Sequence, residues 1–118
     1  MNDRSEYVGE WKKGKPHGLG QFVAANGMEY QGEYREGVPW GEGRFIGEDQ
    51  RSYVGSYLKG VRMGQGTYIW PDGRKYVGEW KSGKEHGFGV WSNKEGDRYE
   101  GGFQEGIRHG TGILTTAG

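Results

Sequence analysis

Large hydrophobic residues recur with a fixed period along the chain. Tyrosine stands every 23 residues, without insertion or deletion, at Tyr7, Tyr30, Tyr53, Tyr76 and Tyr99. A glycine follows two residues after each tyrosine, and Trp, Tyr or Phe follows four residues after it. This alternation predicts a short strand that places both rings on one face. Its recurrence predicts five stacked copies of one supersecondary unit.

Each predicted strand is followed by a turn and a returning strand. In the first repeat, residues 12–16 contain Gly14, which adopts the positive φ of a tight reversal without strain. Residues 17–23 alternate again, and a second glycine-containing break leads into the next tyrosine. The sequence therefore predicts an all-β fold: an elongated, twisted, single-layer antiparallel β-meander of five β-hairpins. About ten strands would form an open, solenoid-like sheet roughly 45 to 50 Å long.

Glycines inside strands weaken them unless something packs closely against the backbone. We infer that aromatic rings lie over the bare backbone of Gly9, Gly18, Gly20 and their equivalents. An aromatic side chain buries about 150 to 250 Å², so three rings per repeat can replace a second layer. The predicted ring-on-glycine core consists of Tyr7, Trp11, Phe22, Tyr30, Tyr34, Phe45, Tyr53, Tyr57, Tyr68, Tyr76, Trp80, Trp91, Tyr99 and Phe103.

The stretches at residues 7–22 (YVGEWKKGKPHGLGQF) and 76–91 (YVGEWKSGKEHGFGVW) resemble MORN repeats, the membrane occupation and recognition nexus family. The resemblance implies a sheet of hairpins that serves as a scaffold within larger proteins, binds protein partners in a groove and associates with acidic phospholipids. An N-terminal extension of residues 1–6 would precede five repeats at residues 7–29, 30–52, 53–75, 76–98 and 99–118.

The repeats depart from one another at a few positions. Trp40 and Met63 stand where three other repeats have histidine, Gln50 replaces a linker glycine, and Leu114 replaces the late aromatic residue. These differences individualise single repeats and leave the family pattern intact.

The composition agrees with this architecture and narrows the function. The chain has 118 residues, of which 26 are glycine, 31% are hydrophobic and 14% are aromatic. This is too little apolar material for a conventional two-layer core and too many rings for a disordered chain. There is no cysteine, which excludes disulfides and thiolate chemistry. The formal net charge is zero, so we expect no nucleic-acid partner.

Catalytic and metal-binding arrangements are not indicated. His17, His86 and His109 occupy one repeat column, and neighbouring repeats are about 9.5 Å apart, too far for shared zinc ligation. The same spacing separates the carboxylates of Glu10, Glu33 and Glu79, which we expect on a solvated face. We therefore expect no enzymatic activity and no cofactor.

The charges are unevenly distributed across the predicted ribbon. The hairpin tips carry nine basic residues against three glutamates, an excess of six positive charges that the remaining residues balance. Near an anionic membrane each basic residue contributes about 1 kcal/mol, although exposed turns are also rich in lysine without binding lipid. The candidate lipid-binding residues are Lys12, Lys13, Lys15, Arg35, Lys59, Arg62, Lys81, Lys84 and Arg108.

Three functional hypotheses follow. The leading one is a scaffold that presents its surface to an extended or helical segment of a partner protein, with Trp40, Met63, Trp70 and Phe88 as contact residues. The pattern does not decide which face receives the partner. The second hypothesis is peripheral recruitment to acidic phospholipids through the hairpin tips. The third is an accessory repeat region of a longer protein whose catalytic domain lies elsewhere.

The ends and the location of the protein are also predicted from the sequence. The N-terminal residues form no signal peptide, and no stretch is apolar enough to cross a bilayer. We expect a cytoplasmic protein, located at the membrane periphery or the cytoskeleton if the scaffold acts there. Since no dedicated cap precedes Tyr7 or follows Leu114, we expect exposed terminal hairpins, with end-to-end homodimerisation as one way to cover them.

Overall fold

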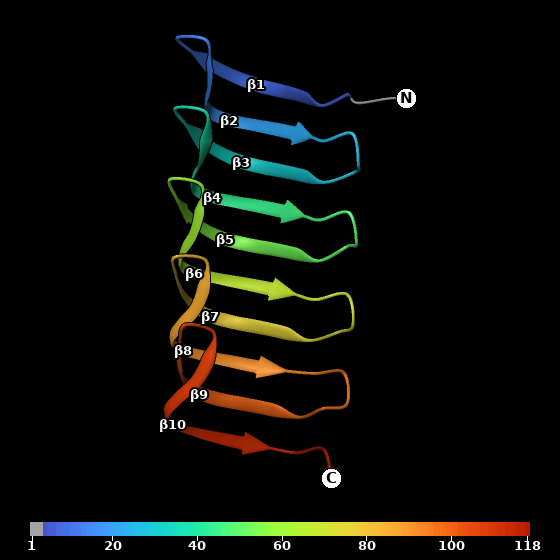
Figure 1. Ribbon diagram of the computed structural model, residues 1–118, viewed down its shortest axis with the longest axis vertical. Helices are drawn as coiled ribbons and strands as arrows, with labels where there is room; N and C mark the ends of the chain where they lie inside the picture. Colours follow the sequence, from blue (N-terminus) through green and yellow to red (C-terminus); the bar gives the residue numbers. More distant parts are fainter. Residues whose placement is uncertain (1–3) are drawn as a thin grey trace.

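All ten strands of the computed structural model, which describes residues 4–118, lie in one antiparallel sheet in chain order (Figure 1). The prediction of an all-β, single-layer open meander is confirmed. The part of the predicted N-terminal extension at residues 1–3 lies outside the described residues. The strands are β1 (Glu6–Lys12), β2 (Lys15–Val23), β3 (Glu29–Arg35), β4 (Val38–Ile46), β5 (Ser52–Leu58), β6 (Val61–Ile69), β7 (Lys75–Lys81), β8 (Lys84–Ser92), β9 (Arg98–Gln104) and β10 (Ile107–Thr115).

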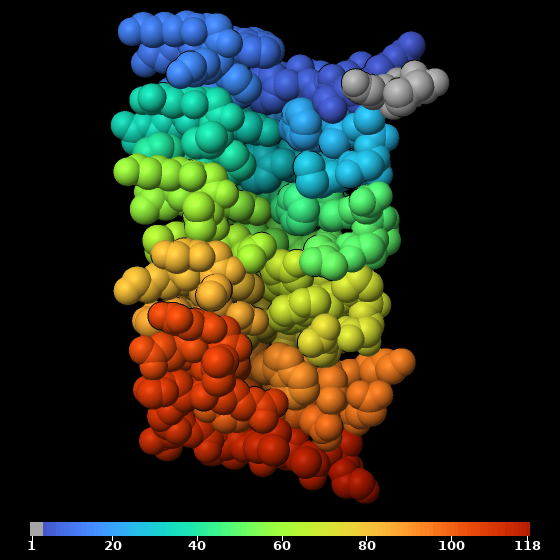
Figure 2. All heavy atoms as spheres, in the orientation of Figure 1, coloured from blue at the N-terminus to red at the C-terminus, as the bar shows by residue number. Residues whose placement is uncertain are grey.

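The sheet is a long, narrow ribbon with extents of 52 × 29 × 18 Å. The hairpin tips follow one another along one side and the linkers between hairpins along the other (Figure 1). The space-filling view shows the tip half and the linker half as two columns of side chains that run along the molecule (Figure 2). Among the described strands, β1 and β10 are each paired on one side alone, so both ends of the sheet are open.

Each hairpin reverses through a two-residue turn, shorter than the five-residue turn predicted. Lys12 opposes Lys15, and the residues between them, Lys13 and Gly14, have φ values of 52° and 79°. Two successive positive φ values define the type I′ turn, whose twist matches that of the flanking strands. The first turn residue is not glycine in any repeat, so this conformation is imposed by the hairpin on Lys13, Glu36, Lys59, Ser82 and Glu105.

Every hairpin bends at an irregularity in the middle of its strands. In the first hairpin, Gly9 opposes Gly20 and Trp11 opposes Pro16, so three residues of β2 face the single residue Glu10 of β1. Gly18 lies within this bulge with a φ of 81°. The same register shift recurs in the other four hairpins. Such bulges bend a strand and increase its twist, and the ribbons turn sharply as they approach the tips (Figure 1).

The bulge also corrects two sequence-based expectations. The Gly18 column does not support an aromatic ring, since a Cβ at Gly18 would meet the Glu10 carboxylate. That carboxylate is not merely solvated, because it accepts a hydrogen bond from the backbone N–H of Leu19 at 2.7 Å. Equivalent bonds at Glu33 and Glu79 show that this carboxylate column bridges the bulge.

The ring-on-glycine contact is clearest in the central repeat. Gly55 of β5 opposes Gly66 of β6, and the fully buried Tyr53 ring lies across both. A Cβ at Gly66 would overlap the Tyr53 phenol. The Tyr53 hydroxyl donates a hydrogen bond to the Ser56 carbonyl at 2.9 Å. Each repeat has the same bond from its tyrosine to the carbonyl three residues on, at 2.7 to 3.1 Å.

The rings also contact one another in a continuous ladder. Ten rings from Trp11 to Tyr99 meet edge to face, with centroids 4.9 to 5.5 Å apart and planes at 82° to 89°. Each such pair contributes about 0.5 to 1.5 kcal/mol beyond its buried area. The second ring of a repeat contacts its own tyrosine and that of the preceding repeat, as Tyr34 contacts Tyr30 and Tyr7.

Most of the predicted core is buried, with one clear exception. Trp11 is 59% exposed, because no described repeat precedes it to supply a second tyrosine, and its assignment to the core is wrong. Tyr7 and Phe22, in the same terminal hairpin, are half-buried. Phe45, Tyr57 and Trp91 pack against the core from partly buried positions. The buried members are Tyr30, Tyr34, Tyr53, Tyr68, Tyr76, Trp80, Tyr99 and Phe103.

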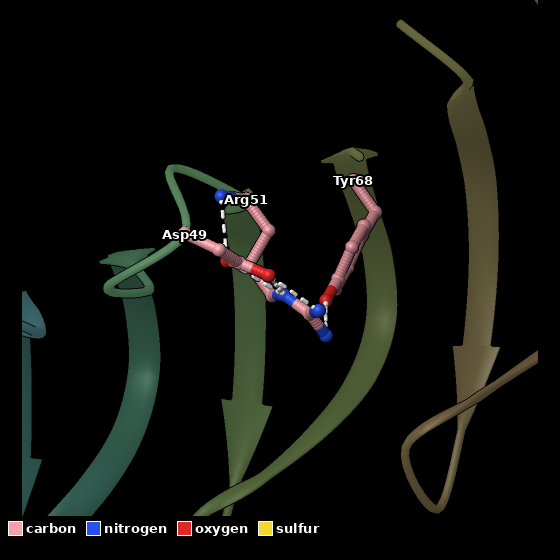
Figure 3. A network of polar contacts seen from close by, with 3 residues as sticks. All are labelled: Asp49, Arg51 and Tyr68. Atoms are coloured by element: carbon pink, nitrogen blue, oxygen red, sulfur yellow. Dashed lines mark hydrogen bonds and ion pairs between the residues drawn. The ribbon is translucent and has the colours of Figure 1, made fainter. Parts of the chain in front are cut away.

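Side chains within the linkers stabilise the second set of turns. The Asp49 carboxylate accepts hydrogen bonds from the guanidinium and the backbone N–H of Arg51, which lower the pKa of this carboxyl group. Arg51 also donates to the Tyr68 hydroxyl at 3.5 Å and so connects the β4–β5 linker to β6 (Figure 3). Gln50, which replaces the linker glycine, keeps a left-handed conformation with a φ of 77°.

A methyl group beneath a ladder ring tests the ring-on-glycine contact. We predict that Gly66→Ala lowers the free energy of unfolding by ~1–3 kcal/mol or more, because the added Cβ displaces the Tyr53 ring. Gln65→Ala, on the exposed opposite face, should change it by less than about 0.5 kcal/mol. Urea unfolding measures both. Equal stability of the two variants would contradict the packing described here.

The buried phenols predict a loss of stability in alkali. Burial raises the pKa of Tyr34 and of Tyr53 to about 12, against an ordinary value of 10.0. Above pH 10.0 the unfolded chain therefore releases protons that the folded chain retains, so stability is intact below this pH and falls as pH rises toward 12. Tyrosinate absorbance should appear together with loss of the β-sheet circular dichroism. Ionisation of these tyrosines at their ordinary pKa in an intact sheet would disprove the prediction.

Candidate binding groove and tip pocket

The bend makes the aromatic face of the sheet concave. The tip half and the linker half of repeats 1 to 3 enclose a groove of about 660 Å³ on this face. This volume lies within the range typical of ligand sites. The rings of Tyr7, Tyr30 and Phe45 line the linker side, and Pro16 and Pro39 line the tip side. The aromatic face is therefore the concave one, a point that the sequence pattern left open.

One repeat column determines how far the groove extends. This column, which we call the gate column, contains Pro16, Pro39, Arg62, Glu85 and Arg108. The short prolines extend no cation over the rings of repeats 1 and 2, which line the groove. Arg62 instead extends its guanidinium over three rings and donates a hydrogen bond to the Gly83 carbonyl at 2.8 Å. The guanidinium carbon is 5.7, 5.1 and 4.9 Å from the ring centroids of Tyr53, Tyr68 and Trp80.

The gate column corrects the predicted lipid-binding edge. Arg62 and Arg108 were expected to extend outward from the hairpin tips. Arg62 is half-buried in the groove, and the Arg108 guanidinium lies 5.0 Å from the Trp91 ring and 4.8 Å from the Tyr99 ring. Cation–π attraction holds both side chains over the aromatic face. Neither guanidinium therefore belongs to an outward-facing basic edge.

The Arg62 guanidinium is incompletely satisfied. Its Nε atom is buried and has no hydrogen-bond partner within the described protein. No carboxylate oxygen of residues 4–118 lies within 4.0 Å of its nitrogens. Burying a polar hydrogen without a partner is costly. The inner end of the groove therefore contains a cation that no carboxylate of the described residues neutralises.

The tyrosine hydroxyls of the groove fall into two groups. Those of Tyr7 and Tyr30 donate to carbonyls of their own strands. Those of Tyr34 and Tyr57 donate to no group within residues 4–118, although both residues line the groove. The groove thus combines apolar ring surface with two available hydroxyls and one cation. Its lining includes no Asp, Glu, His or Ser among the described residues.

A second hollow lies between the first two hairpin tips, on the opposite face. This tip pocket has a volume of about 720 Å³, and Glu33 and Glu36 partly offset its positive charge. The Arg35 guanidinium lies 4.8 Å from the centroid of the Trp40 ring. A smaller hollow of about 460 Å³ between the last two tips contains Lys81, Lys84 and His86. The basic residues of the tip pocket are Lys12, Lys13, Lys15, His17 and Arg35, and its aromatic residues are Tyr34 and Trp40.

The four residues predicted to contact a partner do not form one surface. Trp40 belongs to the tip pocket, and Met63 is half-buried in the same column of the next repeat. The Trp70 ring packs against Tyr68 at 4.6 Å, on the core side of the linker edge. Phe88 is 58% exposed on the face opposite the rings. A partner cannot contact all four from one side of the ribbon.

The aromatic residues of the groove were predicted from the sequence as core, and Arg62 was predicted as a lipid-binding residue of a hairpin tip. The signal that could have revealed the groove was the gate column, in which two prolines precede an arginine at the same position of successive repeats. Within residues 4–118, no three His, Asp or Glu side chains are grouped closely enough to hold a metal ion. The same residues contain no helix that is long and apolar enough to cross a bilayer.

A comparison with protein families agrees with the observed hairpins. The MORN repeat model matches residues 7–29, 30–50, 53–73, 76–98 and 99–117. A comparison with curated protein sequences found no significant match. Repeats of this family are non-catalytic modules that typically mediate interactions with proteins or membranes. Five matched repeats cover nearly all of the sheet, and the chain belongs to the MORN repeat family.

Proposed function

We propose that this chain is a non-enzymatic scaffold that binds an extended or helical segment of a partner protein in the concave groove. The observation that supports this proposal most strongly is the groove of about 660 Å³, which the prolines of the gate column leave open over the aromatic rings of repeats 1 to 3. Hollows lined by aromatic side chains are favourable sites for the anchor residues of a partner.

The construction of the groove supports this proposal. Its walls are strands, and Tyr34 and Tyr57 are held edge to face against other rings at 5.1 and 5.4 Å. Each tip is fixed to the preceding one by a backbone hydrogen bond, as from the Gly37 N–H to the Pro16 carbonyl at 2.9 Å. A preorganised surface loses little conformational entropy when it binds. The lining described above offers contacts and supplies no acid–base pair for catalysis.

Filling the groove tests the proposal. We predict that Pro39→Arg blocks it, because Arg62 and Arg108 already lie over the rings from the same repeat position. Phage-displayed peptides selected on the wild-type chain should bind the variant at least about tenfold more weakly. Gln21→Arg adds the same charge on the exposed opposite face and should leave binding unchanged.

Two results would count against the groove. Selected peptides that bind Pro39→Arg as tightly as the wild type would place the contact elsewhere. Binding that is lost instead when Trp40, Met63, Trp70 and Phe88 are all replaced by Ala would assign it to the residues predicted from the sequence. Circular dichroism of each variant establishes that the sheet is intact.

A second candidate function is recruitment to anionic membranes through the tip pocket. The observation that favours it is the gathering of Lys12, Lys13, Lys15 and Arg35 around one hollow with Trp40 in its wall. Cations beside an aromatic ring suit the interface between headgroups and acyl chains. This role would place the protein at the periphery of a cytoplasmic membrane surface.

Vesicle sedimentation tests the membrane candidate. We predict that binding increases with the anionic lipid fraction, falls with salt and is reduced at least about tenfold when Lys12, Lys13 and Lys15 are replaced by Gln. The control replaces Lys59, Lys81 and Lys84, which lie outside the tip pocket, and should have a smaller effect. Equal losses in both triple variants would indicate general charge attraction and would contradict a role for the tip pocket.

A further inference from the structure

The positive charge of Arg62, which no carboxylate of the described residues neutralises, and the spacing of the repeats together define the chemistry of the groove occupant. We propose that the groove binds an extended, polyproline-II-like segment with an apolar residue at every third position and a carboxylate that pairs with Arg62. This inference rests on the proposed function and specifies the partner of that same groove.

The distance between successive repeats matches the period of a polyproline II helix. Successive repeats lie two strands apart, which is about 9.6 Å. Three residues of a polyproline II helix advance about 9.3 Å. Every third side chain of such a segment therefore meets an equivalent position in the next repeat. The apolar subsites are the ring surfaces of Tyr7 and Phe22 and of Tyr30 and Phe45, one repeat apart.

Two tyrosine hydroxyls of the groove are available to donate hydrogen bonds to a bound segment. The hydroxyls of Tyr34 and Tyr57 line the groove one repeat apart and donate to no group within residues 4–118. A polyproline II segment has no internal hydrogen bonds, so its carbonyls can accept from both hydroxyls. The carbonyls of a helix interior are already occupied. Aromatic-lined grooves recognise polyproline II segments in this way in other domains.

The inner end of the groove is positively charged, because it contains the Arg62 guanidinium. Arg62 is held by the rings beneath it and by the Gly83 carbonyl, while its Nε has no partner. No carboxylate of residues 4–118 neutralises it. A partner carboxylate would pair with the positive charge of the half-buried guanidinium through a charge-assisted hydrogen bond, which is stronger than one between neutral groups. Glutamate or aspartate one period beyond the apolar residues meets this requirement.

The experiment uses the full chain and synthetic peptides. The probe is a proline-rich peptide with leucine at every third position and glutamate one period beyond the last leucine, prepared in both sequence orders. The comparison peptide has glutamine in place of glutamate. We expect the better order of the glutamate peptide to bind at least about tenfold more tightly than its glutamine counterpart. The Arg62 Nε–H resonance should shift when the glutamate peptide binds.

Matched variants assign the preference to Arg62. Arg62→Met removes the charge and keeps an apolar stem, so it should abolish the difference between the two peptides. Arg108→Met removes an arginine stacked in the same column outside the groove, and should retain the difference. For each variant, the measured quantity is the ratio of its affinities for the glutamate and glutamine peptides. A loss of stability weakens the binding of both peptides and leaves this ratio unchanged. Equal affinities in the wild type, or a preference that survives Arg62→Met, would overturn the proposal.

Two further outcomes separate this inference from the proposed function. The first uses an alanine-rich helical peptide whose leucines and glutamate lie about two turns apart. If this peptide binds more tightly than the proline-rich glutamate peptide, the extended conformation of the occupant is wrong. Shifts of the Tyr34 and Tyr57 ring resonances without a preference for glutamate would remove the assigned occupant and keep the groove. Unchanged ring resonances with every peptide, including those selected by display, would remove the groove as a binding site.

Discussion

The contact between a tyrosine ring and two facing glycines holds this sheet together without a second layer. The ring of Tyr53 can lie across Gly55 and Gly66 because neither residue has a side chain in its way. Its hydroxyl then satisfies the Ser56 carbonyl at the bulge. Burial, hydrogen bonding and strand register thus depend on the same residue. The stacking of repeats follows, since the next ring packs edge to face against it.

The bulge that this hydroxyl supports also creates the two candidate binding regions. By bending each hairpin, it makes the aromatic face concave and spreads the opposite face around the tips. Differences between repeats then individualise a regular framework. Pro16 and Pro39 leave the groove open, whereas Arg62 closes it over the following rings. We infer that single columns, which the framework leaves free to vary, distinguish the surface of one repeat from that of the next.

The fold could be predicted from the sequence because its period and glycine columns reflect local backbone requirements. Tyr7, Gly9 and Gly20 identify both the strands and the faces, and the ten strands follow the predicted order, although each returning strand begins earlier than the pattern indicates. The bend could not be predicted, because its two additional residues preserve the alternation and keep Phe22 on the expected face.

The groove was hidden for a related reason. Arg62 is assigned to a hairpin tip in the sequence, and its inward direction depends on the bend. Trp11 was assigned to the core because all residues at its repeat position are aromatic. Its ring is exposed because burial at this position also requires the tyrosine of a preceding repeat. Side-chain direction and neighbour identity are properties of the stacked array, whereas the pattern describes one repeat at a time.

The most direct measurement of the central contact is the NMR chemical shift of the glycine Hα protons. A ring that lies flat over the backbone shifts these protons strongly upfield through its ring current. The structure predicts large upfield shifts for one Hα each of Gly43, Gly66 and Gly89, where an added Cβ would overlap a tyrosine ring, and ordinary shifts for Gly14 and Gly27, where an added Cβ would meet no atom within 4 Å. Ordinary shifts at Gly43, Gly66 and Gly89, equal to those of glycines in strands without an overlying ring, would contradict the ring-on-glycine contact.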